Sequence, residues 1–338
     1  MSFADGGRDA LREIAKTTIA AIKAKAFRLN GVVHVLHIKS SEKGTRYYSP
    51  DSSLSQWPSN PPHMYNAAPK QQQPTTTSAA HIAPLTYHPH PRAIPVAVYI
   101  SILEISTLDG ARLLLQTNLT NGRTAILNFA SATKPGGGFL NGAQAQEESI
   151  ARSSTLYPTL LTSTAQKFYD LHNLDANNGF YSHSMIYSPG VVVFRSDDGG
   201  WTQPIEVDVL TSAAVNAGEV RKSMRARLSR KVIDDDIERQ MRERMARILY
   251  LFQKEGVKNI VLGSFGTGVF NNDVDVVARL WADLLSVPEA RFRSSFDRVV
   301  FAIIGRKTFV EFENAFNTRT KDLEVRSQIK MRPGGIGH

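Results

Sequence analysis

The first part of the chain carries a helical pattern followed by a short strand pattern. Between residues 7 and 29, apolar side chains recur at spacings near one helical turn, which predicts a helix with one apolar face. These side chains are Ala10, Leu11, Ile14, Ala15, Ile19 and Ile22. The segment 31–37, GVVHVLH, predicts a strand. We expect residues 1–50 to form an N-terminal helical extension that packs on a larger core.

Strand and helix patterns alternate between residues 96 and 318, where we place this core. Apolar, β-branched runs predict strands over 96–105, 124–129, 191–194, 206–209, 259–262 and 298–304. Helical periodicity predicts helices over 146–157, 235–255, 274–285 and 309–316. The acidic residues 234–236 suit the start of the second of these helices, because negative charge is favoured at a helix N-terminus. This order is typical of a three-layer α/β domain with a mixed sheet.

Two segments fall outside this pattern. Residues 51–95 hold nine of the sixteen prolines and the tract QQQPTTTS, which predicts a long loop or insertion. Their four histidines, His63, His81, His88 and His90, match no standard metal-ligand spacing. Residues 319–338 are basic and end in PGGIGH, so we expect a disordered tail.

Composition narrows the class of protein. The formal net charge is +9 and the pI is about 9.7, which favours polyanionic partners, although an ordinary basic surface is the simpler explanation. Residues 221–231 carry six basic side chains and no acid, a pattern that fits a polyanion contact, a nuclear import signal or a solvated loop.

The sequence contains no cysteine and no pattern typical of a membrane-spanning segment. The absence of cysteine excludes disulfides and thiolate metal sites. The sequence has no run of apolar residues long enough to span a membrane and no apolar leader after Met1. We therefore expect an intracellular protein of the cytoplasm or nucleus with no membrane partner.

The segment 128–148, NFASATKPGGGFLNGAQAQEE, carries the most informative chemistry. A strand ends, three glycines allow backbone torsions closed to other residues, and two adjacent carboxylates follow. Glycosidic cleavage needs a carboxylic acid that keeps its proton near neutral pH. A neighbouring carboxylate raises the pKa of such an acid, whereas the dipole of the helix that starts here opposes the shift. Either half of the segment alone also fits a flexible loop or an acidic first helical turn.

A second glycine-rich segment, 263–272 or GSFGTGVFNN, follows the strand NIVL and precedes a helix. A turn of this kind presents backbone N–H groups to phosphate. An ordinary strand-to-helix turn would give the same pattern.

Together the two segments resemble poly(ADP-ribose) glycohydrolases, whose signature is Gly-Gly-Gly followed a few residues later by Gln-Glu-Glu. The stretch 126–157, which ends ESIARSSTLY, looks like the bacterial-type branch, also found in fungi. The resemblance extends weakly upstream through REIAKTT and GTRYYSP and strongly downstream. It covers most of the chain except residues 51–95 and the tail.

The resemblance implies a macrodomain-like three-layer α/β/α sandwich and a set of site residues. Glu148 would protonate the departing ribose hydroxyl and then deprotonate the attacking water, Glu147 would fix a ribose hydroxyl, and Gln146 would support the loop. Phe270 would pack against the terminal ribose, and the amides around Gly266–Phe270 would hold the diphosphate. The candidate substrate-binding residues are Asn128, Gly136, Gly137, Gly138, Asn141, Ser264, Phe265, Gly266, Thr267, Gly268, Val269 and Phe270.

The resemblance also implies partners. The substrate would be poly(ADP-ribose), free or on poly(ADP-ribosyl)ated proteins, cut from its free end to release ADP-ribose, by a monomer that needs no cofactor and no metal. One departure is that simple macrodomains carry Asn-Ala-Ala-Asn where this chain has Asn128 and, three residues later, Ser131. Two alternatives are an ADP-ribose reader without catalysis and a hydrolase of single ADP-ribose units on protein or DNA.

Overall fold

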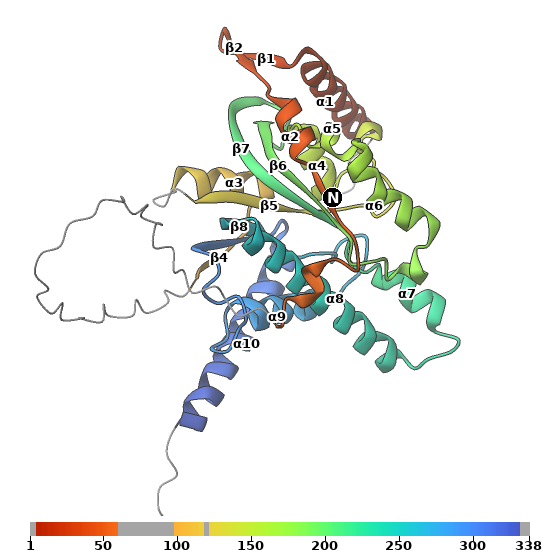
Figure 1. Cartoon of the computed structure of the whole chain (residues 1–338), viewed down its shortest axis with the longest axis vertical. Coiled ribbons are helices and arrows are strands. Elements are labelled where there is room, and N and C mark those ends of the chain that lie inside the picture. Colours follow the sequence, from red (N-terminus) through yellow and green to blue (C-terminus); the bar gives the residue numbers. More distant parts are fainter. Residues whose placement is uncertain (1–4, 60–97, 118–121, 332–338) are drawn as a thin grey trace, which may run out of the picture.

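A seven-stranded mixed sheet forms the centre of the computed structural model, which describes residues 5–59, 98–117 and 122–331 (Figure 1). Its strand order is β3 (Arg46–Tyr48), β6 (Met185–Arg195), β7 (Trp201–Ser212), β5 (Arg123–Phe129), β8 (Val257–Leu262), β9 (Arg298–Ala302) and β4 (Tyr99–Leu103). Strands from β7 to β4 run parallel to their neighbours, whereas β6 is antiparallel to both β7 and β3. The predicted α/β class with a mixed sheet is confirmed.

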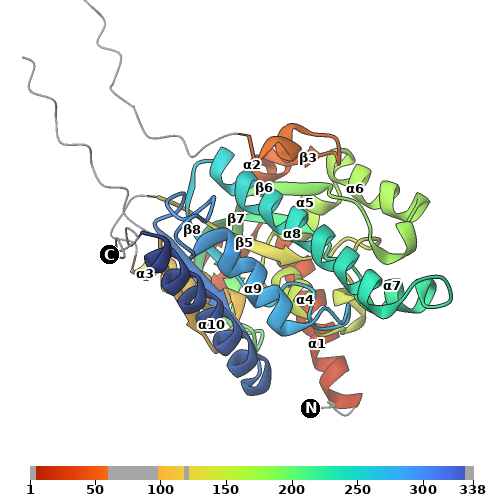
Figure 2. The ribbon, with the colours of Figure 1, turned by 90° about the horizontal axis from the view of Figure 1, so that it is seen from below.

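Helices cover both faces of the sheet, because successive residues of a strand point to opposite sides. Ala125 and Leu127 of β5 pack with α8 (Arg230–Lys254), α9 (Val274–Leu285) and α10 (Arg306–Met331). Ile126, between them, packs on the other face. That face is covered by α3 (Thr107–Gln116), α4 (Gln146–Ser153), α5 (Leu156–Leu160) and α6 (Ser163–Leu174). Figure 2 shows α8, α9 and α10 side by side on the first face.

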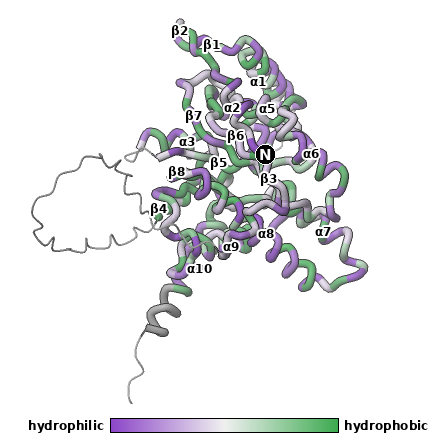
Figure 3. The backbone as a smooth tube through the Cα atoms, in the orientation of Figure 1, coloured by the Kyte–Doolittle hydropathy of each residue, from purple (hydrophilic) through white to green (hydrophobic). Residues whose placement is uncertain are grey.

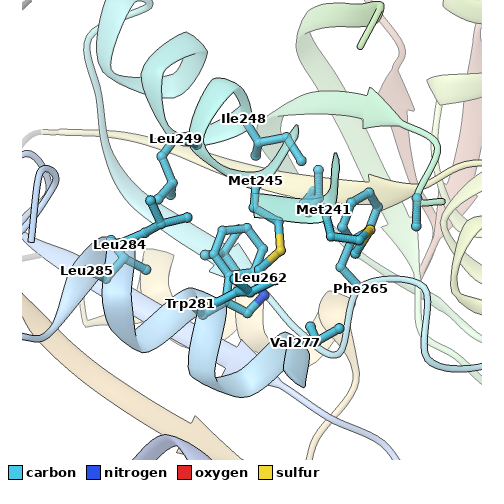
Figure 4. Close-up of a cluster of buried hydrophobic side chains, with 14 of the residues drawn as sticks. Met241, Met245, Ile248, Leu249, Leu262, Phe265, Val277, Trp281, Leu284 and Leu285 are labelled. Atoms are coloured by element: carbon cyan, nitrogen blue, oxygen red, sulfur yellow. The ribbon is translucent and has the colours of Figure 1, made fainter. Parts of the chain in front are cut away.

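The layer formed by α8 and α9 shows how the helices bury one side. Buried side chains of α8 and α9 form one cluster with Leu262 and Phe265 (Figure 4). They are Met241, Met245, Ile248 and Leu249 of α8 and Val277, Trp281, Leu284 and Leu285 of α9. In Figure 3, hydrophilic and hydrophobic residues alternate along the helices, as amphipathic packing requires. Among the described residues, no helix is both long and apolar enough to cross a membrane.

The N-terminal segment differs from the predicted single helix. The helix α1 (Asp5–Ala24) ends before residue 29, because β1 (Ala26–Leu29) and β2 (Val32–Val35) form a hairpin. Asn30 and Gly31 at its turn have φ values of 49° and 80°, the torsions of a two-residue Asn-Gly turn. The short helix α2 (Ile38–Gly44) and strand β3 follow, and β3 joins the central sheet.

Other elements also depart from prediction. The helix predicted over 146–157 breaks at Ser154, which is extended and bridges to Val193. The last helix runs to Met331, so the expectation of a disordered tail is wrong for 319–331, and 332–338 lie outside the described residues. The sequence patterns also missed five short elements. They are α2, β3, α3, α6 and α7 (Ala217–Met224).

The predicted insertion, residues 51–95, lies outside the described part of the chain from residue 60 onward, together with its four histidines. Its first residues form η1 (Ser53–Gln56), whose Leu54 is buried. Trp57 Nε1 donates to Glu243 Oε2 of α8 at 2.9 Å. The beginning of this segment is therefore packed against the core, while the domain limits at 50, 95 and 318 stay predictions.

Candidate active site

Three loops meet at one edge of the sheet, where β5, β7 and β8 end. These neighbouring strands are parallel, so their carboxyl ends lie together, and chain connections leave β5 in opposite directions. Such an edge is where open α/β sheets bind ligands. The rings of Phe129, after β5, and Phe265, after β8, are 5.6 Å apart. The two glycine-rich segments recognised in the sequence therefore line one site.

Gln146 begins α4 and ties it to the end of β5. Its side-chain Oε1 accepts from the amide of Phe129 at 2.8 Å, and its Nε2 donates to the carbonyl of Leu127 at 2.7 Å. The amide group thus pairs with the strand as another strand would. This anchoring fixes the position of the next two residues, Glu147 and Glu148.

Glu147 is the more enclosed of the two carboxyl groups, with 2 % of its surface exposed. Burial raises its pKa to about 8, even though hydrogen bonds from Ser131 and Asn128 lower it, and the charge of Glu148 adds to the rise. Ser131 N donates to Oε2 at 2.7 Å, and Asn128 Nδ2 donates to Oε1 at 3.2 Å. The raised pKa that the sequence argument requires therefore falls on this member of the pair.

Glu148 faces the triple glycine and is 9 % exposed. Its Oε1 accepts from the amide of Gly138 at 2.9 Å. Gly137 has a φ of 59°, and a Cβ placed there would collide with that same oxygen and lie 3.1 Å from Glu147 Oε2. Only glycine allows the backbone to approach both carboxyl groups this closely. Gly136 has a similar φ of 66° and lies beside the rings of Phe139 and Tyr157.

The N-terminal helix holds this glycine loop from outside. Arg12 Nε donates to the carbonyl of Asn141 at 3.3 Å. Phe139, in η2 (Phe139–Asn141), is buried with Ala15 of α1 and packs edge-on against Tyr157, with ring centroids 4.8 Å apart. Asn141 thus meets α1 through its backbone.

The second loop, 263–272, is built differently. Trp281 Nε1 donates to the carbonyl of Gly263 at 3.1 Å, and Asn272 Nδ2 donates to the carbonyls of Gly266 and Val215 at 2.9 and 2.7 Å. Within the part of the chain that the structure describes, the amides of Ser264, Gly266, Gly268, Val269 and Phe270 in this loop donate to no protein group. A run of bare amides of this kind binds anions.

The candidate side chains of this loop fall into two groups. Phe265 is fully buried in the core below the site, so only its backbone faces the loop, and Thr267 Oγ1 donates to the carbonyl of Ser264 at 3.0 Å. Val269 is 81 % exposed, and Phe270 lies 5.9 Å from the ring of Tyr181. Val269 is therefore the most accessible candidate side chain of this loop, and Phe270 is half-buried beside Tyr181.

Sequence reasoning missed three residues that shape the site. Thr211 Oγ1 accepts from Asn128 Nδ2 at 3.2 Å, and Tyr181 follows η3 (Asn177–Gly179) beside Phe270. Arg244 is fully buried and donates to the carbonyls of Ala213 and Phe180, both at 2.9 Å. Burial lowers the pKa of Arg244 to about 9, with Arg247 adding to the effect.

The Oδ1 atom of Asn128 is buried beside the carboxyl pair and has no hydrogen-bond partner among the described residues. Among the described residues, no cluster of histidine, aspartate and glutamate could hold a metal ion. The site therefore offers a carboxyl pair, a free amide oxygen and a bare amide loop, which suits a ligand rich in hydroxyl and phosphate groups.

Comparison with known proteins agrees with this chemistry. The sequence model of the microbial-type PARG catalytic domain matches residues 15–196. A solved poly(ADP-ribose) glycohydrolase from Thermomonospora curvata is 32 % identical, with 92 % of this chain and 99 % of that chain covered and a TM-score of 0.72. A structure of the enzyme from the same organism bound to the inhibitor ADP-HPD gives the same identity and coverage and a TM-score of 0.71.

A third similar structure is the poly(ADP-ribose) glycohydrolase of Deinococcus radiodurans in complex with ADP-ribose. It is 28 % identical, with 88 % of this chain and all of that chain covered, and the TM-score is 0.65. No curated protein sequence matches the chain. The match to the family over more than half of the chain, with the agreement in fold, shows that the chain belongs to the microbial-type poly(ADP-ribose) glycohydrolases.

Proposed function

We propose that the chain hydrolyses the ribose–ribose O-glycosidic bonds of poly(ADP-ribose), with Glu148 as the general acid and base. The observation that carries this role is the contact between the glycine loop and the carboxyl group. Gly138 N holds Glu148 Oε1 at 2.9 Å, and the missing side chain at Gly137 leaves the carboxyl open to a ligand. Glu147 is enclosed by Asn128 and Ser131 instead.

The reaction begins with proton transfer from Glu148 to the oxygen that links two riboses. The bond between this oxygen and the anomeric carbon breaks, and the departing polymer leaves with a new hydroxyl group. The remaining ribose passes through an oxocarbenium-like state. Water then adds to the anomeric carbon, and its proton goes to Glu148, which restores the acid and releases ADP-ribose.

Glu147 stands beside this acid. Burial raises the pKa of Glu147 to about 8, so its carboxyl group keeps a proton near neutral pH. Glu147 also positions a ribose hydroxyl, and the free Oδ1 of Asn128 accepts from a second hydroxyl group.

The remaining contacts orient ADP-ribose. The bare amides between Gly266 and Phe270 bind one side of the diphosphate, the backbone of Gly136–Gly138 lies beside the other, and Phe270 packs against the terminal ribose. We expect cleavage from the free end of the polymer, including polymer carried on poly(ADP-ribosyl)ated proteins. The Deinococcus relative, whose structure holds ADP-ribose, supports this choice of ligand.

The test is the substitution Glu148→Gln, with Glu311→Gln on the exposed side of α10 as the matched control. Glutamine keeps the shape of the side chain but cannot transfer the proton. Turnover of poly(ADP-ribose) should fall by on the order of 10²- to 10⁴-fold, while the Kd for ADP-ribose changes only slightly. The wild-type chain is assayed on two substrates in parallel, poly(ADP-ribose) and a mono-ADP-ribosylated protein.

Three results would contradict the proposal. Near-normal polymer cleavage by Glu148→Gln would remove the residue from its role. Binding of ADP-ribose by a wild-type chain that cleaves neither substrate would indicate a reader. Faster release from the mono-modified protein would indicate a hydrolase of single ADP-ribose units.

A further inference from the structure

We propose that a basic pocket between α7 and α8 binds the polymer unit that follows the scissile bond, through its diphosphate. This inference rests on the proposed function, because it concerns the same substrate. The pocket has a volume of about 380 Å³ and is lined by Arg221, Lys222, Arg225, Leu228, Arg230 and Ile233. None of the residues assigned to catalysis or to ADP-ribose binding lies in it.

The pocket is continuous with the proposed phosphate loop. Gly218 N, in the first turn of α7, donates to the carbonyl of Phe270 at 3.1 Å. Arg221, one turn later, donates from Nη1 to the carbonyl of Asn271 at 2.7 Å and pairs through Nη2 with Asp273 at 2.8 Å. At the rise of an α-helix, Arg225 lies about 10 Å along the axis from Gly218. Figures 1 and 2 show α7 and the turn into α8 at the edge of the molecule.

This position matches the path of the departing chain. Phe270 is the residue proposed to pack against the ribose whose anomeric carbon is attacked. The polymer leaves from that carbon, so its next unit begins beside Phe270. Because the first turn of α7 contacts Phe270 through Gly218, the pocket at the other end of this helix can receive the next diphosphate.

The charges of the pocket divide into fixed and available ones. Arg221 and Arg230 both pair with Asp234, at 2.8 and 2.5 Å, and shape the wall. Lys222 is held only by Glu219 at 3.9 Å. Within the described residues, Arg225 is in no ion pair, and its side chain is exposed. The pocket thus keeps at least two cationic groups, Lys222 and Arg225, that a phosphate can contact.

The wall chemistry favours a nucleotide-like polyanion. Arginine offers paired donors to phosphate oxygens, which makes it well suited to a diphosphate. Leu228 is 40 % exposed and gives the same pocket an apolar side against which a base or ribose can pack. A nucleic acid offers the same groups, but nothing would place it beside Phe270, whereas the substrate is already held there.

The experiment compares Lys222→Gln/Arg225→Gln with Lys39→Gln/Lys43→Gln, which removes the same charge from exposed residues of α2. Each pair is made in the wild-type chain and in the Glu148→Gln chain. The first set is assayed on poly(ADP-ribose) and on an aryl glycoside of ADP-ribose, whose leaving group has no phosphate. The second set gives Kd values for polymer and for ADP-ribose at several salt concentrations.

Loss of two exposed cation–phosphate contacts should raise the KM and the Kd for polymer roughly tenfold. The salt dependence of polymer binding should become shallower, because fewer counterions are released. Cleavage of the aryl glycoside, the Kd for ADP-ribose and the α2 control should stay at wild-type values.

The proposal is contradicted if the α2 variant weakens polymer binding as much as the pocket variant does. It is also contradicted if the pocket variant slows cleavage of the aryl glycoside as strongly as cleavage of the polymer. A DNA oligonucleotide that competes for the pocket as well as the polymer does would contradict it too. Failure of the proposed function looks different. A wild-type chain that cleaves neither substrate would refute the activity, yet polymer binding in the Glu148→Gln set would still decide the pocket.

Discussion

The two glycine-rich loops of the site differ in what surrounds them. At Gly137 an added Cβ would collide with Glu148 and lie 3.1 Å from Glu147, whereas at Gly268 no atom lies within 4 Å. The first loop is closed on protein groups, and the second presents bare amides to solvent. Glycine therefore serves two purposes here. In one loop it lets the backbone reach a carboxyl pair, and in the other it leaves room for a ligand.

This difference has a structural cause. The first loop is held on the outside by α1, through Arg12 and Phe139, and on the inside by Gln146 against β5. The second loop is held through its carbonyl groups, by Trp281 at Gly263, by Asn272 at Gly266 and by α7 at Phe270. We infer that the first loop, proposed to be catalytic, is preformed before substrate binds. The second loop, proposed to hold the diphosphate, would obtain its missing hydrogen bonds from the ligand.

The largest effect on activity should come from adding a side chain to the first loop, with Gly137→Ala. The substitution forces a side chain into a φ of 59° and against the oxygen of Glu148. A displacement of the acid by about 1 Å can reduce turnover on the order of 10²-fold. We expect a loss of this size in kcat on poly(ADP-ribose), together with a lower Tm.

Gly256→Ala is the matched control. Gly256 also has a positive φ, 72°, but a Cβ added there would meet no described residue within 4 Å apart from its chain neighbours. It should cost about 1 kcal/mol of stability through backbone strain alone and leave kcat unchanged. Equal activities of the two variants would mean that the carboxyl groups tolerate displacement and that the first loop is not preformed.

The loops also show what sequence can reveal. Gly136–Gly138 and Gln146–Glu148 were predicted because glycine torsions and adjacent carboxylates are local properties. The partners that fix them lie far along the chain. Thr211 reaches Asn128 from β7, and Arg244 reaches Phe180 and Ala213 from α8. A pattern within one segment contains no information about such pairs.

The fold shows the same division between local and distant information. The helix α9 was predicted with its observed bounds, because its apolar face is continuous from Val274 to Leu285. The break between α4 and α5 was not predicted, because it depends on the bridge from Ser154 to Val193 of β6. The strand β3 spans only Arg46–Tyr48, too short to show an alternation, and exists because β6 offers it an edge.

The free energy of unfolding should also depend on pH, because the carboxyl group of Glu147 is buried beside the first loop. The ordinary pKa of glutamate is 4.5, and burial raises that of Glu147 to about 8. The folded chain therefore binds this proton more tightly than the unfolded chain. The contribution of Glu147 to stability is therefore largest below pH 4.5, decreases as pH rises to about 8 and is constant above that. The total decrease is up to about 5 kcal/mol.

The substitution Glu147→Gln removes this titration. The free energy of unfolding is measured with denaturant at pH 5 and pH 8.5. Relative to the wild-type chain, Glu147→Gln should gain more stability at pH 8.5 than at pH 5. Glu311→Gln, on the exposed side of α10, should show the same small change at both. A gain for Glu147→Gln that is equal at the two pH values would show that the ionised form is accommodated in the folded state.

The smallest effect should come from filling the open loop, with Gly268→Val. The space around Gly268 is empty and its backbone is not in the left-handed region, so the variant should fold with an unchanged Tm. The valine side chain would stand among the amides of Gly266, Val269 and Phe270 and hinder the approach of a diphosphate. Loss of one charge-assisted hydrogen bond, about 1.5 kcal/mol, weakens ADP-ribose binding roughly tenfold.

Gly266→Ala is the contrasting variant. Its residue has a φ of 77° and a Cβ there would lie 2.7 Å from Asn272 Nδ2, so this change should lower both Tm and affinity. Calorimetry with ADP-ribose and melting curves separate the two cases. If Gly268→Val binds ADP-ribose as tightly as the wild-type chain does, the diphosphate does not bind at the second loop.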